Sequence, residues 1–151
     1  MKNGVGNKMI DSEKLSKYGI LIQGVRNVTP SEARELCSLG AMILDVRPLY
    51  ESDYRAFDVP EVLLAPASEY TEWKENLPRE RCLIVADASG LKSRTIARRL
   101  MDDGYTLVVN LSGGIVDWER SGAPVIVNKE SKLTGSCLCQ LKPRYKKEKE
   151  I

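Results

Sequence analysis

Histidine is absent from this chain of 151 residues. The absence excludes a Ser-His or Cys-His catalytic pair within the chain, and it excludes imidazole as a metal ligand or as a proton switch. Acid–base chemistry near neutral pH would therefore fall to Asp, Glu, Lys, Cys or Tyr side chains whose pKa values are shifted. The range of catalytic mechanisms open to this protein is narrow.

Long apolar runs and a strong net charge are also absent. No stretch approaches the roughly 20 apolar residues of a membrane-spanning helix, and residues 1–16 lack the apolar core of a secretory signal. We therefore expect no membrane contact and a cytoplasmic location. A formal net charge of +2 is too small to indicate nucleic acid as a partner. With 42% hydrophobic and 29% charged residues, the composition is typical of one soluble globular domain.

The chain has only four cysteines. Cys37 and Cys82 fall in patterns typical of a core helix and a core strand. Cys137 and Cys139 form a Cys-x-Cys pair near the C-terminus. This spacing differs from the evenly spread framework of a secreted disulfide-bonded protein.

Short apolar strands alternate with helices, which predicts an α/β fold with a mainly parallel central sheet and helices on both faces. Thr29, Pro30 and Glu32 form the clearest helix start, a capping box with proline at the first helical position. We expect strands at 25–28, 42–46, 62–64, 83–86 and 107–110. We expect helices at 30–39, 48–54, 68–76 with Ser68 as cap, 93–103, and from Gly114 to about Gly122.

The loop between the strand at 83–86 and the helix predicted to open at Ser93 is the most informative segment. Its small residues and the free N–H groups of the helix start are typical of an anion-binding cradle. Its first residue is Asp87, and the candidate anion or substrate residues that follow are Ala88, Ser89, Gly90, Leu91, Lys92 and Ser93. In parallel sheets the ligand crevice lies beyond the carboxyl ends of the strands, where we expect Asp45, Asp87 and Asn110.

Three motifs, in this order, resemble those of a single-domain rhodanese, the sulfurtransferase fold shared with Cdc25-type phosphatases. They are Asp45-Val46-Arg47, Ser89 to Ser93, and Asn110 to Ile115 followed by Trp118. The resemblance covers about Val25 to Val127 and implies a three-layer α/β fold. We expect an N-terminal extension at 1–20, a rhodanese-like domain at 21–127 and a C-terminal tail at 128–151.

The departures from the family pattern bear on function. Active members carry a cysteine as the first loop residue, where it holds a donor sulfur as a persulfide, and Asp87 stands at the matching position. Where the family usually has the segment Gly-His-Ile-Pro-Gly-Ala, this chain has Phe57-Asp58-Val59-Pro60-Glu61-Val62. The resemblance thus implies a loop without sulfur transfer, in a domain that binds or regulates. The expected partner is an unidentified protein, or a small anionic or sulfur-containing ligand at the loop.

Two hypotheses describe the role of the Asp87 side chain. In the favoured one its carboxylate accepts hydrogen bonds from the loop N–H groups and fills the anion site itself. In the other it is a nucleophile, as in phosphatases that use aspartate and bind Mg²⁺, but those enzymes place a second acid two residues later, where this chain has Ser89. A phosphate-binding P-loop is rejected because its first glycine and its Gly-Lys step are missing, and we expect no cofactor.

Charged residues near the loop also have alternative roles. Asp45 and Arg47 are expected to form a structural pair beneath the loop. Lys92 and Arg94 would either draw an anionic ligand to the loop mouth or belong, with Arg98 and Arg99, to a solvated helix face.

The tail cysteines leave several alternatives open. Cys137 and Cys139 would form a readily reduced disulfide or pass a persulfide between them. Alternatively, two chains would each give two thiolates to one Zn²⁺ ion or iron–sulfur cluster. A third reading gives them no dedicated role. The sequence does not indicate an oligomeric state.

Overall fold

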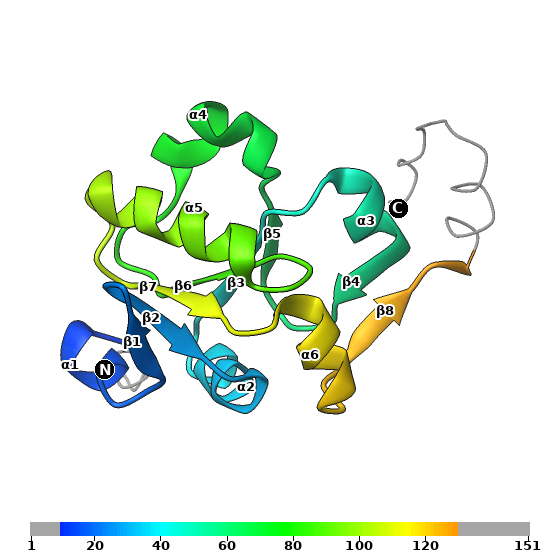
Figure 1. Ribbon diagram of the computed structural model, residues 1–151, viewed down its shortest axis with the longest axis horizontal. Coiled ribbons are helices and arrows are strands. Elements are labelled where there is room, and N and C mark those ends of the chain that lie inside the picture. The colour runs from blue at the N-terminus through cyan, green and yellow to red at the C-terminus, as the bar shows by residue number, and fades with distance from the viewer. Residues whose placement is uncertain (1–9, 130–151) are drawn as a thin grey trace, which may run out of the picture.

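The computed structural model describes residues 10–129 and confirms the α/β class. A six-stranded sheet has the order β1-β2-β7-β6-β3-β5, and all neighbours are parallel except β1 and β2 (Figure 1). Its strands are β1 (Ile20–Ile22), β2 (Val25–Val28), β3 (Met42–Asp45), β5 (Val62–Leu64), β6 (Leu83–Ala86) and β7 (Val108–Leu111). A separate antiparallel pair joins β4 (Arg55–Phe57) to β8 (Val125–Val127).

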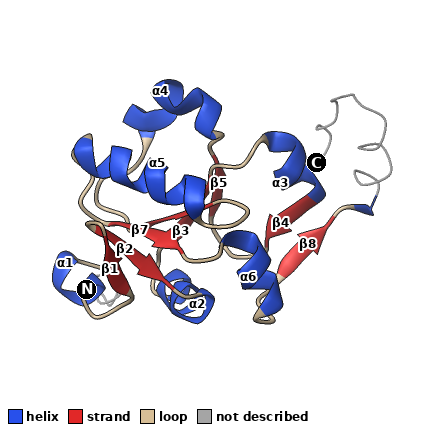
Figure 2. Cartoon of the chain, viewed as in Figure 1, coloured by secondary structure: helices blue, strands red, loops and turns tan. Residues whose placement is uncertain are grey.

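Helices cover both faces of the six-stranded sheet (Figure 2). The α-helices of the described residues are α1 (Ser12–Leu15), α2 (Pro30–Ser38), α3 (Leu49–Tyr54), α4 (Tyr70–Trp73), α5 (Leu91–Asp102) and α6 (Gly114–Arg120). Residues of α1, α2 and α6 pack in one core cluster, and residues of α4 and α5 pack in the other. None of the helices within 10–129 has the length and apolarity needed to cross a membrane.

The central strand β6 is apolar throughout, and all four of its residues are buried. Successive side chains of β6 alternate, with Ile84 and Ala86 in one core cluster and Leu83 and Val85 in the other. Trp118 of α6 is fully buried, and its indole N–H donates to the carbonyl of Pro124 at 2.8 Å. The two cores thus fix the position of β6, and with it the loop that follows.

Several local predictions are confirmed and others are wrong. The predicted strand at 25–28 is β2, and α2 has the predicted capping box. The single helix predicted at 68–76 is wrong, since the segment forms η2 (Ala67–Glu69), α4 and η3 (Lys74–Asn76), and Ser68 lies inside η2 rather than at a cap. Pro78, four residues after Lys74, has no N–H to donate to the Lys74 carbonyl, and the Tyr105 hydroxyl donates to that carbonyl instead.

Residues before β1 take part in packing. Ile10 and Leu15 are buried in the same core cluster as α2, although both fall within the predicted N-terminal extension. The sequence analysis also missed β1, β4 and β8. Each is only three residues long, a length at which periodicity does not distinguish a strand from a loop, although β5, of the same length, was predicted.

The capping box of α2 yields a stability prediction. Replacing Thr29 with Ala removes the side-chain oxygen that accepts the Glu32 N–H at 3.1 Å, so we expect the free energy of unfolding to fall by about 1 kcal/mol. Chemical denaturation measures this change. Thr95→Ala, at an exposed position of α5, is the control and should not destabilise the protein. An equal loss in both variants would contradict the capping role.

Candidate functional site

The polar residues predicted at the strand ends do meet at one edge of the sheet. Asp45 is the last residue of β3 and pairs in register with Ala86, which directly precedes Asp87. On the other side of β6, Val85 pairs with Asn110 of β7. The parallel arrangement therefore brings Asp45, Asp87 and Asn110 together, as expected for a crevice at the carboxyl ends of the strands.

The helix after the loop begins earlier than predicted. α5 starts at Leu91 rather than at Ser93, and its N-cap is Gly90, with φ of +96°. A Cβ at Gly90 would lie 2.7 Å from the backbone nitrogen of Gly113. Glycine is therefore required at this position for its backbone conformation and for space. Ser93, predicted as the helix start, lies in the first turn and is fully buried.

Asp87 supplies the side-chain cap that Gly90 lacks. Its carboxylate accepts the backbone N–H groups of Lys92 at 2.9 Å and Ser93 at 3.2 Å, and also that of Gly90. Only 6% of Asp87 is exposed. A negative charge held by the N–H groups of a helix start is a stabilising arrangement. The prediction that this carboxylate accepts the loop N–H groups is confirmed.

A buried polar network continues from the loop into the sheet. The Ser93 hydroxyl, which has one proton to donate, lies between Oδ1 of Asp87 and Oδ1 of Asn110. The Asn110 side-chain amide donates to the Gly90 carbonyl at 3.1 Å and to Oδ1 of Asn27 at 2.7 Å. Asn27 was not predicted as a site residue, although an asparagine in the short strand 25–28, which begins and ends with valine, was a signal.

The opposite side of the loop is fixed by α6. The backbone N–H groups of Ile115 and Val116 donate to the carbonyls of Asp87 and Ala88, at 2.9 Å and 3.2 Å. A Cβ at Gly114 would lie 2.4 Å from the backbone of Ala88. The Gly113-Gly114 pair therefore allows α6 to approach the loop closely, and Asp87 joins two helices, one through its carboxylate and one through its carbonyl.

Asp45 and Arg47 form the predicted ion pair. Two nitrogens of the Arg47 guanidinium donate to the two carboxylate oxygens, at 3.0 Å and 2.7 Å, and both side chains are buried. Ser52 donates to the same carboxylate, while Arg47 also donates to the carbonyl of Arg55. The pair therefore connects β3 to α3 and β4, next to the start of the loop.

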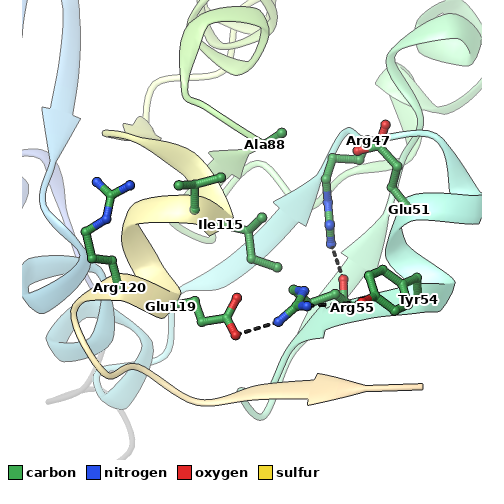
Figure 3. Close-up of a pocket in the computed structure, with 9 residues that line it drawn as sticks. Arg47, Glu51, Tyr54, Arg55, Ala88, Ile115, Glu119 and Arg120 are labelled. Atoms are coloured by element: carbon green, nitrogen blue, oxygen red, sulfur yellow. Dashed lines mark hydrogen bonds and ion pairs between the residues drawn. The ribbon is translucent and has the colours of Figure 1, made fainter. Parts of the chain in front are cut away.

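An open cleft of about 520 Å³ lies beside the loop (Figure 3). It is lined by Arg47, Glu51, Tyr54, Arg55, Ala88, Ile115, Val116, Glu119 and Arg120. Arg55 of β4 pairs with Glu119 of α6 across it. Of these lining residues, sequence analysis had named only Arg47 and Ala88 as site residues. The cleft depends on the pairing of β4 with β8, and no sequence signal indicated that pairing.

The basic residues of α5 differ in their contacts. Arg98 donates to the carbonyl of Gln23, and the guanidinium of Arg99 stacks 4.0 Å from the ring centre of Tyr70. These two residues hold neighbouring segments against α5. Lys92 is exposed and Arg94 is half-buried, and their attraction of an anionic ligand stays a prediction.

The cysteines fall into two groups. Cys37 and Cys82 are buried, as predicted, and desolvation raises the pKa of their thiols to about 11 and about 12. Both therefore stay protonated and unreactive at neutral pH. Cys137 and Cys139 lie outside the described residues. Within 10–129, no three Cys, Asp or Glu side chains are grouped so that they could hold a metal ion.

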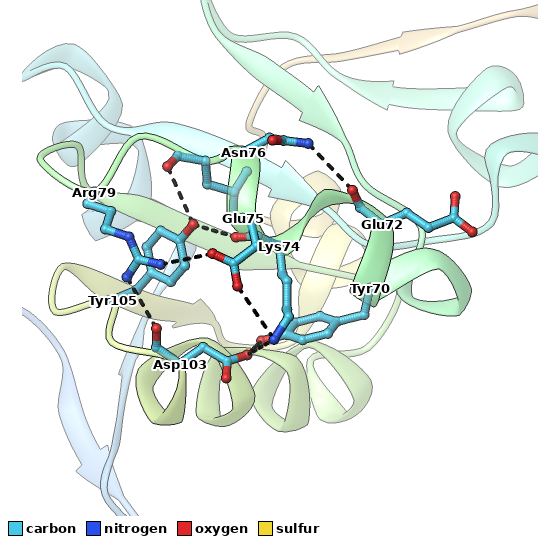
Figure 4. Close-up of polar contacts among 9 residues, drawn as sticks. Tyr70, Glu72, Lys74, Glu75, Asn76, Arg79, Asp103 and Tyr105 are labelled. Atoms are coloured by element: carbon cyan, nitrogen blue, oxygen red, sulfur yellow. Dashed lines mark hydrogen bonds and ion pairs between the residues drawn. The ribbon is translucent and has the colours of Figure 1, made fainter.

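A second polar cluster connects η3 and α4 to the end of α5 (Figure 4). The Tyr70 hydroxyl donates to the Asp103 carboxylate at 2.6 Å, and Lys74 approaches the same carboxylate. The hydrogen bond from Tyr70 holds the pKa of Asp103 below its usual value, while burial raises the pKa of Tyr70. The Arg79 guanidinium stacks 4.0 Å from the Tyr105 ring centre. These side chains contact one another, so we assign the cluster a structural role.

Comparison with known proteins points to one family. The family model for the rhodanese-like domain matches residues 29–121. A sulfurtransferase of Allochromatium vinosum is 32% identical over 68 residues, which span 45% of this chain and 64% of that protein. The thiosulfate sulfurtransferase GlpE of Actinobacillus pleuropneumoniae serotype 7 is 30% identical over 100 residues, which span 65% of this chain and 90% of that protein.

Solved structures agree with this result. A rhodanese-related protein from Thermoplasma volcanium superimposes with a TM-score of 0.59 at 27% identity, covering 68% of this chain and 99% of that one. A rhodanese-like domain from Anabaena sp. gives a TM-score of 0.60 at 19% identity, covering 80% and 93%. At 19% identity, the second structure supports the fold alone.

The buried ion pair yields a stability prediction. Arg47→Met leaves the Asp45 carboxylate buried without its counter-charge, so we expect the free energy of unfolding to fall by about 3–5 kcal/mol. Arg120→Met is the control, because Arg120 pairs with Asp117 at the exposed surface and such pairs contribute about 0–1 kcal/mol. Chemical denaturation of both variants tests this, and similar losses would refute the structural role of the buried pair.

Proposed function

Because this chain belongs to the rhodanese-like domain family, we propose that it is a member whose active loop no longer transfers sulfur and whose loop and neighbouring cleft bind a partner. In this proposal Asp87 stands where active relatives carry the cysteine that holds a persulfide. A carboxylate has no sulfur with which to form one. The domain then acts as a binding or regulatory module.

One observation carries the proposal: the Asp87 carboxylate already occupies the loop. Three backbone N–H groups point at it, those of Gly90, Lys92 and Ser93. An incoming anion would have to displace a buried carboxylate that already accepts three backbone N–H groups, which is unfavourable. The adjacent cleft is open, and we therefore place the binding of an unidentified protein or a small anionic ligand there.

The first functional prediction concerns the transfer of sulfur from thiosulfate to cyanide. We expect the chain with Cys137→Ser and Cys139→Ser to show only background formation of thiocyanate. In the same background, Asp87→Cys should raise the rate at least about tenfold, because it restores a thiol to the loop N–H groups. Asp87→Ser is the matched control, since a hydroxyl cannot carry a persulfide.

Two results would contradict this account. Thiocyanate formation by the Asp87 chain well above background, at a rate equal to that of Asp87→Cys, would show that the loop transfers sulfur without a thiol of its own. An equal gain in Asp87→Ser would show that removal of the carboxylate, not the thiol, is responsible.

A second candidate function is that of a sulfur carrier using Cys137 or Cys139. The observation that favours it is the end of β8, where the N–H of Asn128 donates to the carbonyl of Tyr54 at 2.8 Å. The C-terminal segment therefore starts at the edge of the cleft. In the reaction, a tail thiolate attacks the outer sulfur of thiosulfate, the S–S bond breaks, and sulfite leaves with the bonding electrons. The product is a cysteine persulfide anion.

This candidate predicts a mass increase of one sulfur atom, about 32 Da, on a tail cysteine after exposure to thiosulfate. Peptide mass spectrometry locates the adduct. Cys37 and Cys82 serve as internal controls, because both are buried thiols with raised pKa values. Absence of the adduct, or an adduct that persists after Cys137→Ser and Cys139→Ser, would exclude it. The alternative metal site shared between two chains would appear as bound metal in a dimer.

A further inference from the structure

We propose that residues 133–141 of this chain bind in the cleft lined by Tyr54, Ala88 and Val116. The inference rests on the proposed function only in treating this cleft as a binding surface, and it does not depend on sulfur transfer. It names the occupant as the chain's own segment, which an external partner would have to displace. Binding of the segment would therefore control the access of an external partner to the cleft.

The cleft offers a mainly apolar floor with charged walls. Ala88, Ile115 and Val116 contribute small or branched aliphatic side chains, and Val116 is 49% exposed. Arg55 and Glu119 on the walls already pair with each other. The part of a ligand that contacts this floor is therefore uncharged and apolar, and any charged group of the ligand faces the walls.

The path of the chain brings such a segment to the cleft. β8 pairs with β4 in the register Arg55↔Val127, so the chain leaves the sheet next to Arg55 and Tyr54, two residues of the cleft wall. The hydrogen bond from Asn128 to Tyr54 holds this exit point. Cys137 is the ninth residue after Asn128. A chain of that length spans up to about 30 Å, which is ample to cross the cleft.

The segment is uncharged, which matches the apolar floor of the cleft, and the residues around it carry a net charge opposite to that of residues 10–129. Residues 133–141 read Leu-Thr-Gly-Ser-Cys-Leu-Cys-Gln-Leu and contain no charged residue. Residues 130–151 carry six Lys or Arg and three Glu, whereas residues 10–129 carry 15 Lys or Arg and 18 Asp or Glu. The opposite net charges favour association within the chain, and the covalent link gives the segment a high effective concentration at the cleft.

Disulfide trapping in the full-length chain tests the inference. Val116→Cys places a thiol on the cleft floor, and Cys139→Ser leaves Cys137 as the thiol of the segment. The matched control is Asp53→Cys, an exposed position adjacent in sequence to Tyr54 and absent from the cleft lining. Each chain is equilibrated at low micromolar concentration in a glutathione redox buffer, and the bonded peptides are identified by mass. Near-UV circular dichroism verifies that both variants are folded.

We expect the disulfide between positions 116 and 137 to form with an effective concentration at least about tenfold above that between positions 53 and 137. A segment that does not bind the cleft would reach position 53, beside the exit point, at least as readily as position 116. Equal trapping at the two positions therefore overturns the inference, as does no trapping at either. A disulfide between two chains overturns it in favour of a second copy as occupant. The trapping result does not depend on whether the chain transfers sulfur from thiosulfate, so failure of the proposed function and failure of this inference can be told apart.

Discussion

The hydrogen bonds between the Asp87 carboxylate and the backbone of the following turn organise the site. The N–H groups of Gly90, Lys92 and Ser93 converge on one place, and with nothing there they would be buried donors without acceptors. Asp87 is itself nearly buried, and its charge would be costly without those donors. Each half of the arrangement therefore requires the other, and together they fix the start of α5.

Because α6 donates to the carbonyls of Asp87 and Ala88, the same short loop is also fixed from its other side. Gly90 and Gly114 permit the two close approaches, since a Cβ at either would collide with backbone atoms. Ala88, held between the helices, then forms part of the cleft wall. A loop fixed on both sides is better suited to present a preorganised surface than to close over a substrate.

Sequence patterns predicted the elements that depend on local signals. The capping box at Thr29 and the apolar runs of β3 and β6 act over a few residues, so the helix α2 and the central strands were found. The start of α5 was misplaced because its cap comes from Asp87, four residues before the helix, rather than from an N-cap side chain. The cleft was missed because β4 and β8 are short and separated by about 70 residues, and such pairing leaves little trace in local sequence.

In the proposed function, aspartate at the loop start preserves the electrostatics of the site while removing its chemistry. A persulfide anion and a carboxylate both carry one negative charge, and both are stabilised by converging N–H groups at a helix start. The buried hydrogen-bond network through Ser93, Asn110 and Asn27 can therefore remain satisfied around Asp87. Only the nucleophilic sulfur is missing. The proposal thus accounts for an intact rhodanese-like fold around a loop without a thiol, and under it any remaining sulfur chemistry would fall to Cys137 and Cys139, which follow β8 in the sequence.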